Sequence, residues 1–410
     1  MMAGPMSGVR VVEVAQFTFV PAAGAVMADW GADVIKVEHA RTGDAQRGLM
    51  KVFGLDAISK GSSFHPMMEG PNRGKRSIGL ALEKAEAREL LYEIVRTSDV
   101  FLTNFLPEAR QKLGIDLEDI RKINPDIIYV RGSGFGPSGP ESNKGGFDST
   151  GFWARGGSGA QINESTEFFL DQPTGAYGDS IGGMTIAGGI AAALFKRATT
   201  GETSVVDVSL LSVGAWTTQF SVNMALMVGG PVPSRPPRKY GSASNPLTGP
   251  YQTSDGRWIM LAMLQPGRYW ADFMTAAGRS DLATDERFDT GEKVLANAAE
   301  ASDVVAELFA TKTYAEMTAA LESQEGQWAA VQNTWEVGND ISLRANGMVA
   351  KVEDAEGVER ELIANPVQFD MTPVSITRAP QFAEHTDDIV RELGHDDERL
   401  IELKLLNAIT

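Results

Sequence analysis

The first half of the chain alternates short apolar runs with amphipathic segments. Residues 9–14 (VRVVEV) and 33–38 (DVIKVE) are β-branched runs typical of strands, with a helical segment at 22–30 between them. The same alternation continues with strand-like runs at 77–82, 99–104 and 126–132 and helical segments at 83–97 and 107–115. The pattern predicts an α/β fold with a parallel sheet, in which loops at the carboxyl ends of the strands bind a ligand.

The second half begins with a linker-like tract. Residues 229–246 (GGPVPSRPPRKYGSASNP) are dense in proline, glycine and serine, so we expect a domain boundary there. Residues 251–263 (YQTSDGRWIMLAM) follow as a hairpin that turns at Asp255 and Gly256. Helical segments come next, and after a less regular stretch at 335–345 the tail ends in the helical EHTDDIVRELG.

Composition and charge narrow the class of protein. A chain of 410 residues is long enough for two domains or one elaborated α/β domain. The net charge of −17 argues against a nucleic-acid partner, and the absence of cysteine excludes disulfides, thiolate metal sites and thiol nucleophiles. The N-terminus lacks a signal-peptide pattern, and the longest uncharged stretch, 180–195, is shorter than the roughly 20 apolar residues of a bilayer crossing. We expect a cytoplasmic protein without a membrane partner.

Two short polar segments near predicted strand ends are candidates for ligand contact. Arg73, Lys75 and Arg76 (in NRGKRS) bring positive charge to an acidic protein, as an anion site requires, although a solvated basic turn has the same composition. Residues 43–47 (GDAQR) follow the strand ending at Glu38, but their aspartate and arginine also suit simple pairing with each other.

A glycine-rich segment at 132–140 (GSGFGPSGP) has the glycine content of a nucleotide-binding loop. A dinucleotide fingerprint must open a helix, however, and Pro137 and Pro140 prevent one. We therefore expect a loop that leads to Phe147 and Asp148.

Asp179 is a lone carboxylate at the start of a small-residue run that carries no other charge before Lys196. One interpretation is an N-cap that accepts the free amides of a helix. The other is a covalent nucleophile: Gly178, Gly182 and Gly183 would leave room for a reacting carbon, and a helix N-terminus would keep the carboxylate ionised and stabilise an oxyanion.

Several segments of the chain resemble the class III coenzyme A transferase (CaiB/BaiF) family, of the formyl-CoA transferase type. They are the segments quoted above together with GVRVVEVAQFTFVPAAGAVMADWGADVIKVE, DVFLTNFLPEARQKLGI, YGDSIGGMTIAGGIAAALFKRATTGE, VVDVSLL and RAPQFAEHTDDIV. The resemblance covers nearly the whole chain. It implies a Rossmann-like large domain made of N- and C-terminal parts, residues 1–225 and 336–410, with a smaller α+β domain at 226–335. It also implies a homodimer of two interlocked rings.

The resemblance further implies an activity and a mechanism. Asp179 would attack an acyl-CoA thioester, become an aspartyl-CoA thioester, and pass CoA to a carboxylic acid, with coenzyme A entering and leaving as part of the substrates. No metal is implied, and His385 and His395 are expected to be structural.

Two groups of positions carry over from the family. Those near the reacting acyl group are Gln16, Phe17, Thr18, Phe147, Asp148, Gly178, Gly182, Gly183 and Gly241. Those near CoA are His39, Arg41, Lys75, Arg76, Leu80, Asn104, Phe105, Ala109 and Lys112. His39 stands where some members have arginine, and Glu83 where some have lysine, so Arg41, Lys75 or Arg76 is expected to supply charge for the phosphates.

Phe147 bears on the choice between reactions. Racemases of the family carry histidine there, and without it a two-base proton exchange loses one partner, which favours CoA transfer. The form FDxxxFWxRGG also resembles transferases of aryl-lactate, hydroxy-acid or bile-acid CoA esters, in which Phe147, Phe152 and Trp153 would form an apolar acyl pocket, unless they are plain core. The alternatives left open are an acyl-CoA racemase or isomerase and a non-catalytic CoA-ester binding protein in which Asp179 only caps a helix.

Overall fold

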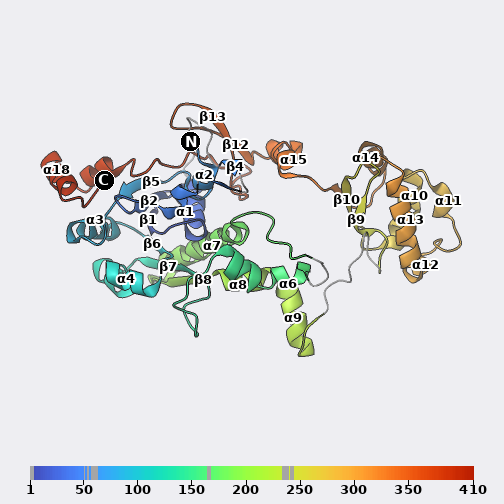
Figure 1. The fold of residues 1–410 in the computed structure, drawn as a ribbon, viewed down its shortest axis with the longest axis horizontal. Coiled ribbons are helices and arrows are strands. Elements are labelled where there is room, and N and C mark those ends of the chain that lie inside the picture. Colours follow the sequence, from blue (N-terminus) through green and yellow to red (C-terminus); the bar gives the residue numbers. More distant parts are fainter. Residues whose placement is uncertain are drawn as a thin grey trace. The chain divides into compact units, whose positions relative to one another are not determined.

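The computed structural model describes residues 4–49, 51–52, 55–56, 63–163, 168–232, 240 and 244–410. The chain forms two compact units, one of Met1–Ser234 with Ile341–Thr410 and one of Arg235–Asp340 (Figure 1). The functional domain limits given above, 1–225, 226–335 and 336–410, stay a prediction.

The larger unit is built on a six-stranded sheet in which every pairing is parallel. Its strands are β1 (Arg10–Val14), β2 (Asp33–Glu38), β5 (Arg76–Gly79), β6 (Val100–Thr103), β7 (Ile128–Ser133) and β8 (Val205–Ser209), in the order β5-β2-β1-β6-β7-β8. The predicted α/β class is therefore confirmed. Because β2 and β6 leave β1 on opposite sides, the topological switch point lies between β1 and β6, where sheets of this kind bind ligands.

Helices cover both faces of this sheet, which explains why its strands are almost continuously apolar. The helices are α1 (Phe19–Asp29), α2 (Pro66–Asn72), α3 (Ala85–Arg96), α4 (Pro107–Leu113), α5 (Leu117–Ile123), α6 (Ser158–Asn163), α7 (Tyr177–Thr200), α8 (Leu210–Thr217), α9 (Gln219–Val228), α16 (Ile341–Ala345), α17 (Thr386–Glu392) and α18 (Asp397–Leu405), with a 3-10 turn η1 (Ala45–Gly48) and a π-helical segment η2 (Asp148–Ala154). One core joins the sheet to α3, α5, α17 and α18, and the other joins it to α1, α7 and α8.

Two short antiparallel pairs complete the larger unit: β3 (Lys51–Val52) with β4 (Leu55–Asp56), and β12 (Val349–Glu353) with β13 (Glu359–Ile363). The C-terminal segment packs against β5, where His385 Nδ1 accepts a hydrogen bond from the Ser77 amide at 3.2 Å. This contact gives His385 a structural role. His395 lies 2.8 Å from Glu93 on α3.

The helix after β1 begins earlier than predicted. The sequence pattern placed it at 22–30, after Pro21, whereas α1 starts at Phe19 and carries Pro21 in its first turn. Proline is tolerated there because the amides of a first turn have no partner within the helix.

The smaller unit has its own sheet and core (Figure 1). The predicted hairpin is confirmed: β9 (Thr248–Gln252) and β10 (Trp258–Ala262) are antiparallel, and Gly256 takes a φ of +80° in the turn. The other elements are β11 (Trp328–Ala330) beside β10, and α10 (Pro266–Ala276), α11 (Ser280–Ala283), α12 (Gly291–Ala296), α13 (Ala298–Ala310), α14 (Tyr314–Leu321) and α15 (Thr334–Gly338).

Within the larger unit, α1 and α7 approach each other closely because α7 carries glycine at the contact. A Cβ added to Gly182 would lie 2.3 Å from the Phe19 ring, and one added to Gly183 would lie 2.5 Å from the Ala22 Cβ. By length and composition α7 could cross a bilayer, but it packs on α1, α8, β7 and β8. Its small-residue face therefore serves helix packing in this fold.

This contact yields a prediction about stability. Gly183→Ala should destabilise the protein by about 1–3 kcal/mol, because the new methyl group overlaps Ala22 and the α1 backbone. Gly188→Ala on the same helix is the matched control: a Cβ there meets nothing within 4 Å, so the change should stabilise by about 0.5–1 kcal/mol. Urea unfolding followed by circular dichroism measures both. Equal effects of the two changes would contradict the packing role of Gly183.

Candidate active site

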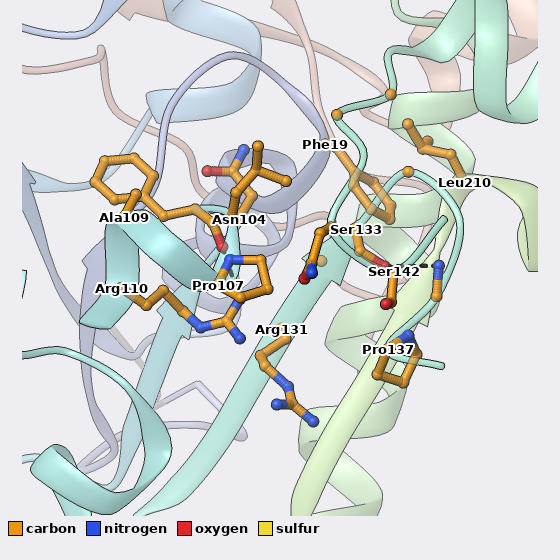
Figure 2. A pocket seen from close by; sticks show the side chains of 18 of the residues that line it. Phe19, Asn104, Pro107, Ala109, Arg110, Arg131, Ser133, Pro137, Ser142 and Leu210 are labelled. Atoms are coloured by element: carbon orange, nitrogen blue, oxygen red, sulfur yellow. Dashed lines mark hydrogen bonds between the residues drawn. The ribbon is translucent and has the colours of Figure 1, made fainter. Parts of the chain in front are cut away.

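A cavity of about 490 Å³ opens at the switch point of the parallel sheet. In Figure 2, Asn104, Pro107 and Ala109 lie on one side of it, and Phe19, Ser133 and Leu210 lie on the other. The lining also includes Gln16, Phe17, Phe105, Arg110, Arg131, Ser142, Asn143, Phe147, Asp179, Asp207 and glycines of the loop after β7. The cavity thus joins the ends of β1, β6 and β7 to the first turn of α7.

Asp179 lies in the first turn of α7, but it does not cap the helix. The N-cap is Ala176, whose φ is +59° and whose own side chain accepts no capping hydrogen bond. Among the residues that the structure describes, none donates a hydrogen bond to the Asp179 carboxylate. The N-cap interpretation is therefore wrong, and Asp179 presents an unsupported carboxylate to the cavity.

Two carboxylates lie close together at this site. Asp148, at the start of η2, is buried, and its Oδ1 accepts the Gly178 amide at 3.0 Å while its Oδ2 accepts Gln172 Nε2 at 3.0 Å. Burial, followed by repulsion from Asp148, raises the pKa of Asp179 to about 7. This raised pKa runs against the expectation that Asp179 is simply kept ionised at the helix N-terminus.

The glycines near Asp179 have a different role from the one predicted. Gly178, Gly182 and Gly183 are buried, and a Cβ on each would collide with Phe152, Phe19 and Ala22 of the same chain. They bring α7 against its neighbours and do not leave space for substrate. The Asp179 carboxylate is reached instead through the cavity that it lines.

One aromatic pair lines the cavity, and two expected pocket residues do not. The Phe17 and Phe147 rings meet edge to face with centroids 5.5 Å apart, and Phe147 is 61% exposed. Phe152 and Trp153 are buried in the core with α1 and α7, so their assignment to the acyl pocket is wrong.

Three of the residues expected to hold CoA, Asn104, Phe105 and Ala109, converge on the switch point. Asn104 after β6 accepts the Gln16 amide at 3.1 Å and donates to the Gln16 carbonyl at 2.7 Å, which ties the β1 and β6 loops together. Phe105 and Ala109 line the same cavity from α4 and the loop before it. Thr18, buried beside them, donates its hydroxyl to Gln46 at 3.0 Å.

The other positions expected near CoA lie outside the cavity lining. His39 is half-buried after β2, with Nε2 3.4 Å from Glu83 Oε1, and Arg41 beside it is exposed. Lys112 is exposed on α4, whereas Leu80 is buried at the end of β5. These four follow strands β2, β5 and β6 at their carboxyl ends, and their contact with CoA stays a prediction.

The basic cluster before β5 is not an anion site. Lys75 is fully buried, with Nζ 2.7 Å from Glu13, and Arg73 pairs with Asp29 at 2.6 Å. Arg76 pairs with Asp33 at 2.8 Å at the amino ends of the strands, the edge opposite the cavity. The expectation that Lys75 or Arg76 supplies charge to a phosphate is wrong, because carboxylates already occupy these cations.

Two arginines of the cavity were not predicted. Figure 2 shows Arg110 and Arg131 at the cavity. Arg110 on α4 bonds Asp116 at 3.0 Å and the Phe105 carbonyl at 2.7 Å. Arg131 on β7 forms a two-pronged pair with Asp207 on β8 at 2.7 and 2.8 Å. The sequence offers one indication of such a pair: a charged residue near the end of an apolar strand, as in IIYVR and VVDVS.

Gly241 lies outside the described residues. Within the described ranges, no group of three or more histidine or acidic side chains is placed to hold a metal ion.

Comparison with known proteins agrees with this architecture. The sequence profile described as "CoA-transferase family III" matches residues 6–386. The chain is 29% identical to (R)-2-hydroxy-4-methylpentanoate CoA-transferase of Clostridioides difficile, over 97% of this chain and 98% of that protein. It is 30% identical to cinnamoyl-CoA:phenyllactate CoA-transferase of Clostridium sporogenes, over 97% and 95%. It is 31% identical to formyl-CoA:oxalate CoA-transferase of Streptomyces avermitilis, over 98% and 99%.

Among solved structures, a CaiB/BaiF family protein from Brucella suis superposes with a TM-score of 0.80 at 27% identity, covering 96% of this chain and all of that one. Full-length similarity to transferases, combined with a carboxylate in a cavity at the switch point, leads to one assignment. The chain belongs to CoA-transferase family III and is a CoA transferase.

Proposed function

We propose that the protein moves coenzyme A from an acyl-CoA thioester to a carboxylic acid through an aspartyl-CoA thioester on Asp179. The observation that carries this proposal is the placement of Asp179: an unsupported carboxylate in a cavity that the predicted CoA positions Asn104, Phe105 and Ala109 also line. A residue held only by its helix has both lone pairs of its attacking oxygen free for a carbonyl carbon.

The first half of the reaction loads the enzyme. An oxygen of Asp179 attacks the thioester carbonyl, the carbon–sulfur bond breaks, and CoA leaves as a thiolate while a mixed anhydride forms. The thiolate then attacks the aspartyl carbonyl, the donor acid leaves as a carboxylate, and Asp179 carries CoA as a thioester.

The second half reverses these steps with a new acid. The acceptor carboxylate attacks the aspartyl thioester and expels the thiolate, and the thiolate attacks the acceptor carbonyl of the second anhydride, which restores the Asp179 carboxylate. Each step exchanges one activated acyl bond for another, so no external energy source enters. Water must be excluded because it would hydrolyse each intermediate.

The cavity favours an apolar acyl group. Phe17, Phe19 and Phe147 supply aromatic surface near Asp179, while Arg110 and Arg131 are already paired with carboxylates. A second carboxylate on the acid would find no unpaired cation among the described lining residues. Racemisation is disfavoured because Phe147 supplies no base beside Asp148, and the helix-cap alternative loses its basis because Ala176 occupies the cap.

Replacing the nucleophile tests the mechanism. Asp179→Asn should lower CoA exchange between cinnamoyl-CoA and phenyllactate by at least about a thousandfold, because the covalent route is closed. Intact-protein mass spectrometry should detect CoA on the unmodified protein and none on the variant. Asp171→Asn, a nearby exposed carboxylate outside the cavity, is the control and should keep both signals. Exchange that survives Asp179→Asn would refute the covalent route, and faster exchange with succinate than with phenyllactate would refute the apolar acyl group.

The raised pKa of Asp179 yields a prediction about pH. Only the ionised carboxylate attacks, so the single-turnover rate of acyl-CoA thioester cleavage should fall about tenfold per pH unit below a midpoint near 7. Asp148→Asn removes the neighbouring negative charge and should move that midpoint to lower pH. Quenched-flow measurement between pH 5 and 9, roughly the range that brackets the midpoint, checks both. A midpoint that Asp148→Asn leaves unchanged would contradict the coupling of the two carboxylates.

We also propose that the protein acts as an interlocked homodimer. The exposed apolar residues of α8 and α9 support an assembly: Trp216 is 70% exposed, Phe220 87% and Leu226 75%, and α9 has no buried residue. A cytoplasmic location stays a prediction, as the homodimer does.

Light scattering after gel filtration tests the dimer. The expected result is twice the mass of one chain, and Phe220→Asp with Leu226→Asp should shift the protein toward the monomer, because charge replaces apolar contact area. Val358→Asp, at an exposed apolar position of the β12–β13 hairpin, is the control and should leave the mass unchanged. A monomer for the unmodified protein would exclude the dimer.

A further inference from the structure

Phe17 has a backbone conformation that a bulky residue rarely adopts. Its φ is +63°, in the left-handed region, where a side chain crowds the backbone. The residue lies in the loop between β1 and α1 and lines the cavity, with its ring against Phe147. Such strain persists only where surrounding contacts impose it, and it concentrates at functional sites.

Three of the four residues of this loop, Gln16, Phe17 and Thr18, are each held by a polar side chain from another part of the chain. Asn104 bonds both backbone groups of Gln16, as described above. Asp44 Oδ1 accepts the Phe17 amide at 3.1 Å, and Gln46 Oε1 accepts the Thr18 hydroxyl at 3.0 Å. The loop is therefore fixed residue by residue, and two of its three supports come from η1 and its N-cap.

Asp44 is held rigidly in turn. It is 1% exposed, and its Oδ2 lies 2.8 Å from the Lys36 ammonium, which also donates to the Ala15 carbonyl at 3.1 Å. Lys36 in turn lies 3.4 Å from Glu13, and the side chains of all three charged residues are fully buried. Burying charges is costly unless each is paired and hydrogen-bonded, as these are.

The pairing expected within GDAQR does not form. Arg47 binds Glu38 at 2.7 Å, and Glu38 also accepts the Asp44 amide at 2.9 Å. Asp44 therefore directs one oxygen to Lys36 and the other to the amides of Phe17 and Gln46. Its position in the fold aims it at the cavity loop, 27 residues away in sequence.

We infer that Asp44 and Gln46 are positioning residues for CoA transfer: they hold the β1–α1 loop in the conformation that presents the Phe17 ring to the acyl group. The inference rests on the proposed function for the identity of that group. It assigns to the GDAQR segment a role in acyl binding that Asp44 and Gln46 exert through Phe17 and Thr18, without touching substrate.

The test compares two buried aspartates with matched contacts. Asp354 also accepts two amides with Oδ1, from Glu356 at 3.0 Å and Val358 at 2.8 Å, and pairs with a cation, Arg360, at 2.8 Å through Oδ2. It is buried, but it lies outside the cavity lining. Asp44→Ala and Asp354→Ala thus remove the same kinds of bonds, and only the first releases Phe17.

Two measurements separate positioning from general stability. Hydrogen exchange of the peptide spanning residues 15–20 should be faster by about tenfold in Asp44→Ala, because the Phe17 amide loses its acceptor, and unchanged in Asp354→Ala. The second measurement uses an Asp179→Asn background, in which CoA transfer is stopped. There the Kd of cinnamoyl-CoA, measured by calorimetry, should rise about tenfold with Asp44→Ala and stay constant with Asp354→Ala. The inference is overturned if hydrogen exchange of this peptide is unchanged in Asp44→Ala, or if Asp44→Ala and Asp354→Ala have equal effects.

A second variant covers a failure of Asp44→Ala to fold. Gln46→Leu carries no charge change, releases the Thr18 hydroxyl, and should speed exchange of the same peptide and raise the same Kd. If cinnamoyl-CoA fails to bind even the unmodified protein, the proposed acyl class is wrong. The hydrogen-exchange measurement alone then decides whether Asp44 and Gln46 position the loop.

Discussion

The close approach of α7 to α1 sets the position of the Asp179 carboxylate, the proposed nucleophile. No hydrogen bond from the described residues holds the Asp179 side chain, so its place over the switch point follows from where α7 lies. That placement depends on Gly182 and Gly183, which let Phe19 and Ala22 of α1 reach the α7 backbone. Helix packing thus does what hydrogen bonds do in many active sites, and it leaves the attacking oxygen unencumbered.

The site combines two opposite treatments of buried charge. On the Asp179 side, two carboxylates lie together without a cation, and burial raises the pKa of both. On the side of the β1–α1 loop, Asp44 is matched by Lys36 and bonded by amides. In the proposed mechanism Asp179, which has no cation partner among the described residues, is the reactive group, whereas the paired Asp44 and Lys36 hold their surroundings rigidly. Asp179 and the β1–α1 loop that this pair holds both line the cavity, so geometry is maintained where the proposed chemistry requires it.

Much of the fold could be predicted because it is written in local patterns. The β-branched runs, the amphipathic helix at 83–97 and the turn at Gly256 all reappear as expected elements. For Asp179, in contrast, the chain's own pattern allows both a helix cap and a nucleophile, and the family resemblance favours the nucleophile. The predictions that were wrong concern contacts between residues distant in sequence. Lys75 pairs with Glu13, 62 residues away, and the glycines of α7 pack against α1. Spacing along a chain does not reveal which side chains a fold will bring together.

The loop that follows β7 has a consequence for how such a protein changes over generations. Eight of the residues 134–147 line the cavity with Asp179, yet the stretch forms no regular element and contributes nothing to either core of the sheet. The supports of the β1–α1 loop come from elsewhere in the chain. Substitutions in this stretch away from the closely packed Gly134 and Gly146 can therefore change the shape of the cavity without disturbing either core, and relatives of this chain carry names as different as formyl-CoA:oxalate and cinnamoyl-CoA:phenyllactate transferase.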